Sequence, residues 1–91
     1  MKKEDLKVIV YGAPEWCHQC QEQLEIFQKE PLIINTKEID IDSLEDDSIL
    51  DKLDISSVPV LLLYNGEEEL KRWEGTTESS EINTYIETLL D

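Results

Sequence analysis

Residues 11–20 read Tyr-Gly-Ala-Pro-Glu-Trp-Cys-His-Gln-Cys and contain the only two cysteines of this 91-residue chain, Cys17 and Cys20. A disulfide between them would close so short a loop that chain entropy gives it only about 2 kcal/mol of stabilisation. Residues three apart on a helix face the same way, and their Cα atoms lie within disulfide range. The pair therefore suits reversible redox chemistry better than holding a fold together.

A strand is predicted before this segment and a helix after it. Leu6–Tyr11 is an apolar, β-branched run that ends at a glycine, which indicates a buried strand and a turn. Cys20, Leu24 and Phe27 recur at the spacing of one helix face until a proline ends the pattern. Cys17 is thus expected at the start of the first helix.

The next part of the chain predicts a second strand and a short helix. Leu32–Ile41 reads as a strand that is buried at its apolar start and alternates towards its end. Ser43 is a favourable N-cap, followed by acidic residues, for a helix that turns Ile49, Leu50 and Leu53 inward.

The last third of the chain predicts a hairpin and a closing helix. Val60–Tyr64 and Glu69–Trp73 read as antiparallel strands, because Asn65-Gly66 is a strong hairpin-turn signal. The apolar residues of the final amphipathic helix are Ile82, Tyr85, Ile86, Leu89 and Leu90. The order β-α-β-α-β-β-α predicts one α/β domain over residues 1–91, with a four-stranded mixed central sheet flanked by helices.

The chain is strongly acidic, with a formal net charge of −14 and its densest acidic run from Glu38 to Asp54. Such a charge repels phosphate groups, so neither nucleic acid nor an anionic membrane is expected as a partner, whereas basic protein surfaces are attracted. A solvated face that keeps the protein in solution is the alternative explanation of the charge. Mutual repulsion of copies also favours a monomer.

The compartment follows from what the sequence lacks. No segment reaches the ~20 apolar residues of a membrane span, and the apolar run after the first residues is too short for an export signal. A cytoplasmic, reducing compartment is therefore expected. There a C-x-x-C pair is catalytic or metal-binding more often than structural.

Four features in register resemble the thioredoxin superfamily over nearly the whole chain. They are Trp16-Cys17-x-x-Cys20 at a strand-to-helix turn, Val58-Pro59 before an apolar strand, Asn65-Gly66, and Gly75 before the last helix. The resemblance implies a minimal thioredoxin fold, similar in size to the compact glutaredoxin-like form.

The resemblance also implies the roles of the cysteines. Cys17, at a helix N-terminus that favours a thiolate, is expected to attack a client disulfide. Cys20 is expected to resolve the resulting mixed disulfide. His18, the only histidine, is expected to stabilise the thiolate; an exposed side chain without effect is the alternative.

Residues far along the chain complete the expected site. A cis peptide is expected before Pro59, which in the family lies against the cysteine pair and leaves Val58 free to pair with an extended substrate strand. Trp16 and Gly75 are expected to form the rim that docks partner proteins. The alternatives are that Trp16 only packs the loop and that Gly75 only ends a strand.

The sequence departs from the residue pattern of the thioredoxin superfamily in three places. Thioredoxins carry a buried aspartate six residues before the first cysteine, where it assists proton transfer from the second. Tyr11 occupies this position, either as a core residue or as a proton donor near Cys20. His18-Gln19 between the cysteines matches neither thioredoxin nor glutaredoxin, and Glu15 disfavours glutathione.

These observations predict a thiol-disulfide oxidoreductase that reduces disulfides in client proteins, which could include ribonucleotide reductase. Electrons are expected from NADPH through a thioredoxin reductase-like donor, with no cofactor and no metal bound by the chain itself. Two cysteines and one histidine fall short of the four ligands of structural zinc. The alternatives are a glutathione-linked glutaredoxin, and a redox-inert interaction module or iron-sulfur cluster carrier on the same fold.

Overall fold

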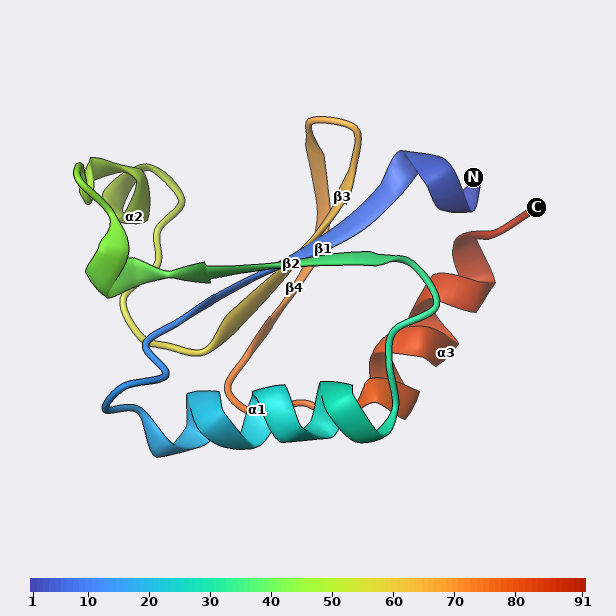
Figure 1. The fold of residues 1–91 in the computed structure, drawn as a ribbon. Coiled ribbons are helices and arrows are strands. Elements are labelled where there is room, and N and C mark those ends of the chain that lie inside the picture. Colours follow the sequence, from blue (N-terminus) through green and yellow to red (C-terminus); the bar gives the residue numbers. More distant parts are fainter.

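The computed structural model describes residues 1–91 as a four-stranded mixed sheet with helices on both faces (Figure 1). The strand order is β2-β1-β3-β4, with β1 parallel to β2 and antiparallel to β3, and β3 antiparallel to β4. The elements are η1 (Lys3–Asp5), β1 (Leu6–Gly12), α1 (His18–Lys29), β2 (Asn35–Asp40), η2 (Ile41–Ser43), α2 (Ser48–Lys52), β3 (Val60–Asn65), β4 (Glu68–Glu74) and α3 (Ser79–Leu89). The predicted α/β class and element order are confirmed.

The two central strands, β1 and β3, are covered on both faces. Helices α1 and α3 pack on one face of the sheet (Figure 1). Between them and the sheet lies a core of ten buried residues. They are Leu6, Val8, Val10, Phe27, Ile34, Leu61, Leu63, Trp73, Ile82 and Ile86. The opposite face carries Tyr11, Val60 and Leu62, which pack against α2 and the residues around it. None of the helices has the length and apolar composition needed to cross a membrane.

The second strand begins later than the sequence predicts, at Asn35 instead of Leu32. The backbone N–H of Ile33 donates to the Asn83 side chain of α3 at 2.9 Å, so it is bonded to a helix and not to a neighbouring strand. Ile34 is buried in the core just before the strand starts. Because β2 is an edge strand, its first four residues are exposed.

The predicted helix after Ser43 is also displaced, because η2 occupies this position. The Asp40 carboxylate accepts the Asp42 N–H at 3.0 Å and the Ser43 hydroxyl at 3.4 Å, so Ser43 does not cap a helix. Helix α2 starts at Ser48, and it leaves Ile49 39% exposed instead of inward. The hairpin turn is shifted by one residue as well: Asn65 ends β3, and Gly66, with a φ of 62°, follows it.

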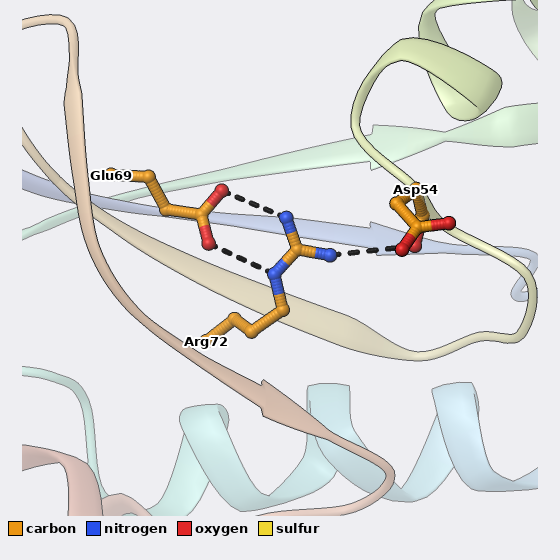
Figure 2. Close-up of polar contacts among 3 residues, drawn as sticks. All are labelled: Asp54, Glu69 and Arg72. Atoms are coloured by element: carbon orange, nitrogen blue, oxygen red, sulfur yellow. Dashed lines mark hydrogen bonds and ion pairs between the residues drawn. The ribbon is translucent and has the colours of Figure 1, made fainter.

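Arg72 of β4 fixes the loop that follows α2 (Figure 2). Its Nε and Nη2 donate to the two carboxylate oxygens of Glu69 at 2.9 and 2.8 Å, and its Nη1 donates to the Asp54 carbonyl at 3.4 Å. The hydrogen bond from Arg72 lowers the pKa of the Glu69 carboxyl. Asp54 has a φ of 57°, a left-handed conformation that Asp tolerates better than most residues. The contact anchors the start of the loop that leads to Val58 and Pro59.

Candidate active site around Cys17 and Cys20

Cys17 is the N-cap of α1, as the sequence predicts. Its Sγ accepts the backbone N–H of Cys20 at 3.2 Å, one of the donors that a helix start leaves without an intrahelical partner. The side chain is only 8% exposed, and both cysteines are free thiols. A thiolate on Cys17 would strengthen this hydrogen bond and would lie at the positive end of the helix dipole.

Cys20 lies one turn further along α1 and is 3% exposed. Its Sγ accepts the Ala13 N–H at 3.3 Å and faces Gly12, where an added Cβ would lie 3.3 Å from the sulfur. The pKa of the Cys20 thiol is raised to about 11, first because of burial and next because of its hydrogen bond with Cys17, while the Ala13 N–H acts in the opposite direction. Cys20 therefore stays protonated until a reaction removes its proton.

The loop before β3 reaches the cysteine pair. The Val58-Pro59 peptide is cis, as expected, and the Cys17 thiol donates to the Val58 carbonyl at 3.8 Å. The Val58 N–H makes no hydrogen bond within the chain. Gly75 donates its N–H to the Pro59 carbonyl at 2.9 Å. Its φ of 83°, and not crowding, accounts for the glycine, because an added Cβ there would meet no atom.

Trp16 stands at the edge of an apolar groove. The indole is 65% exposed, and its Nε1 donates to the Asp42 carboxylate at 2.7 Å. The groove measures about 350 Å³ and is lined by Trp16, Ile41, Leu50, Ile55, Ser56, Ser57 and Val58. The structure thus brings Trp16 and Val58 into one surface next to Cys17, and their role in docking stays a prediction.

His18 does not contact the sulfur of Cys17. Its side chain is 82% exposed, and Nε2 lies 3.0 Å from the Glu22 carboxylate, one turn along α1. Any effect of the imidazole on a Cys17 thiolate would therefore act through its charge alone. The role of His18 at the site stays a prediction. No group of three or more His, Cys, Asp or Glu side chains is arranged to hold a metal ion.

Tyr11 fills the core on the α2 face and does not approach Cys20. Successive residues of a strand point to opposite faces, and Gly12 is the residue that faces the Cys20 sulfur. Tyr11 packs with Val60 and Leu62 instead. Burial, and to a smaller extent Tyr64, raises the pKa of its hydroxyl. Of the two roles considered for Tyr11, the structure fits the core residue and not the proton donor.

Sequence reasoning missed two polar residues that shape the site. Gln23 is fully buried, and its amide donates to the Thr77 carbonyl at 2.9 Å and accepts the Thr77 N–H at 2.7 Å. It sits three residues after Cys20 on the inward face of α1, a position that could have revealed it. No feature of the sequence indicated Asp42, because its hydrogen bond with Trp16 depends on the tertiary fold.

Comparisons with known proteins agree with this fold. The family profile described as thioredoxin matches residues 1–88. A mutant thioredoxin from Halobacterium salinarum is 21% identical over 97% of this chain and 77% of its own, with a TM-score of 0.80. A structure described as a malarial protein is 21% identical over 97% of this chain and 100% of its own, with a TM-score of 0.77.

The reduced thioredoxin pre-protein of Schistosoma mansoni is 22% identical over 97% of this chain and 82% of its own, with a TM-score of 0.76. At such identities these structures show a shared fold. No curated protein sequence is similar enough to count as a match. The family profile, together with the adjacent Cys17 and Cys20 at the start of α1, settles the general class. The chain belongs to the thioredoxin family and is a thiol-disulfide oxidoreductase.

Proposed function

We propose that the protein is a cytoplasmic reductase of disulfides in client proteins. The observation that carries this proposal is the position of the Cys17 sulfur. It caps α1, contacts the Val58 carbonyl at 3.8 Å, and so lies beside the apolar groove that Val58 and Trp16 line. A client disulfide seated there would meet the attacking sulfur at the point where the helix stabilises its negative charge.

The reaction proceeds in two exchanges. The Cys17 thiolate attacks one sulfur of the client disulfide, forms a mixed disulfide and releases the first client thiolate. Cys20 then attacks the Cys17 sulfur, and the bond from Cys17 to the client breaks. The products are a Cys17–Cys20 disulfide and a client with two thiols, so the client has gained two electrons.

The backbone of Val58 supports binding of an extended client segment. Its N–H is unpaired and its carbonyl faces Cys17. An extended peptide could pair with these groups as an added strand, with its side chains reaching the groove. Trp16, with Asp42 holding the indole, would supply apolar contact area at the rim.

The charge of the chain supports basic partners. The net charge is −14, and Asp42, Asp47 and Asp51 lie in or next to η2 and α2, the elements around the groove. Electrostatic attraction between this acidic surface and a basic partner raises the rate of association, and added salt weakens it. We infer a basic docking surface on the electron donor, a thioredoxin reductase-like protein that passes on electrons from NADPH, and on clients such as ribonucleotide reductase.

Coupled turnover tests the proposal. NADPH oxidation is followed with thioredoxin reductase, this protein and insulin as the disulfide substrate. The wild type should turn over, Cys17→Ser should be inactive, and Cys20→Ser should stop after one exchange with insulin bound through Cys17. Turnover only with glutathione and glutathione reductase would instead identify a glutaredoxin. An inactive protein with the visible absorbance of an iron-sulfur cluster would identify a cluster carrier.

A redox titration gives the direction of the reaction. The Cys17–Cys20 pair is equilibrated with dithiol/disulfide buffers, and free thiols are trapped with a mass tag. A potential of about −270 mV, typical of thioredoxin, is expected for a reductant. A value of about −180 to −120 mV would identify an oxidase or isomerase and contradict the proposal.

A further inference from the structure

A cavity of about 180 Å³ lies against Cys20, on the sheet face that α1 covers. Two acidic residues of the edge strand β2, Glu38 and Asp40, line it together with Cys20. In the parallel pairing of β1 with β2, Glu38 is opposite Val10 and Asp40 is opposite Gly12. Paired residues point to the same face, so both carboxylates share the face on which Gly12 meets Cys20.

The resolving step of the proposed reaction requires a proton acceptor near this sulfur. Cys20 must lose its proton as it attacks Cys17, yet burial raises the pKa of its thiol. Once Cys17 is part of a mixed disulfide, its thiol no longer raises the pKa of Cys20. Burial, the largest cause of the raised pKa, remains. Tyr11 lies on the opposite face of the sheet and cannot take this part.

Of the two acidic residues that line the cavity, only Glu38 has a carboxylate without a hydrogen-bond partner. Asp40 uses one oxygen for the Asp42 N–H and the other for the Ser43 hydroxyl, which holds η2 in place. The Glu38 side chain makes no hydrogen bond or ion pair within the chain, and the residue is exposed to solvent. The other residues of the cavity, from β1, α1 and the Pro59 loop, include no titratable group except Cys20 itself. Cys17 is the remaining titratable group in contact with Cys20.

We propose that Glu38 accepts the proton of Cys20 through water in this cavity while Cys20 resolves the mixed disulfide. The inference rests on the proposed function. A cavity of this size, with two acidic residues in an otherwise largely apolar lining, has room for bridging water. The bond between the Cys20 and Cys17 sulfurs forms as the bond from Cys17 to the client sulfur breaks. The proton of Cys20 passes to the Glu38 carboxylate and then to solvent, and the departing client thiolate takes a proton from solvent.

The two exchanges can be timed separately with a dipyridyl disulfide in a stopped-flow experiment. The first thiopyridone is released when Cys17 attacks, and the second when Cys20 resolves. Glu38→Gln should leave the first phase unchanged and slow the second roughly 100-fold, the lower end of what a positioned proton acceptor contributes. Acid quenching followed by mass spectrometry should then trap the Cys17 mixed disulfide in the variant.

The pH profile separates a proton acceptor from a structural residue. In the wild type the second phase should change little across neutral pH. In Glu38→Gln it should rise about tenfold per pH unit, because hydroxide must then remove the proton. Glu25→Gln removes the same charge from an exposed position of α1 outside the cavity, and it should behave as the wild type.

Three results would overturn the assignment of Glu38. The second phase of Glu38→Gln could match the wild type at every pH, both phases could slow together with a loss of thermal stability, or Asp40→Asn alone could slow resolution. Failure of the wild type to release the second thiopyridone at all would instead refute the proposed function.

Discussion

Trp16 and Asp42 are joined by a 2.7 Å hydrogen bond from the indole Nε1 to the carboxylate, although they are 26 residues apart. The bond holds an exposed aromatic ring against η2 at the edge of the groove. An exposed ring without this anchor would sample several rotamers, and a client would have to order it on binding.

Asp42→Ala should therefore weaken client binding without changing sulfur chemistry. A net hydrogen bond contributes about 1 kcal/mol, which corresponds to a loss of roughly fivefold in kcat/KM for insulin reduction. Reaction with a small disulfide should be unaffected. Asp51→Ala removes the same charge from α2 without a side-chain bond and serves as the control. An equal loss in both variants would show that charge, and not the position of Trp16, matters.

Gly12→Ala should disturb Cys20 directly. The new Cβ would lie 3.3 Å from the sulfur, which is tighter than ordinary contact, and 3.5 Å from the Cys20 Cβ, which is ordinary contact. Overpacking of this kind costs about 1–3 kcal/mol. Urea unfolding should show this loss, and the second phase of the dipyridyl disulfide reaction should slow. Gly66→Ala, which strains a distant turn, should lower stability while leaving both phases intact.

Gln23→Ala should destabilise the junction between α1 and the segment that leads into α3. The change leaves the Thr77 N–H and carbonyl without partners, and each buried polar group left unsatisfied costs about 1–3 kcal/mol. A lower urea midpoint with an unchanged slope should report it. Gln28→Ala, on the exposed side of the same helix, should change stability by less than about 0.5 kcal/mol.

The reduced protein should lose stability in alkali through Cys20. Its pKa is raised to about 11 in the fold, whereas an unfolded thiol titrates at about 8.5. Between about pH 8.5 and 11, unfolding therefore releases the Cys20 proton. The raised pKa contributes its full share of folding stability below about pH 8.5, and this share is lost as the pH rises towards 11. Cys20→Ser should show a shallower decline in chemical denaturation from pH 8 to 11. Parallel curves for the two proteins would contradict the prediction.

The sequence was sufficient for features that depend on neighbours along the chain. The helix start at Cys17 and the order of elements follow from local spacing, and the cis peptide before Pro59 follows from the resemblance to the thioredoxin superfamily. It was insufficient where a distant group decides. The start of β2 depends on a bond from Ile33 to Asn83, and the position of Glu38 and Cys20 around one cavity depends on the register between two strands.

The N-cap of α1 links the stability of this helix to the redox state of the protein. The Cys20 N–H is bonded to the sulfur that reacts, so the first turn is held best when Cys17 is an anion and less well when it is part of a neutral disulfide. By linkage, whatever stabilises the dithiol makes the disulfide a stronger oxidant, by about 30 mV for each 1.4 kcal/mol. The hydrogen bond from one backbone amide thus contributes to the reduction potential of the Cys17–Cys20 pair.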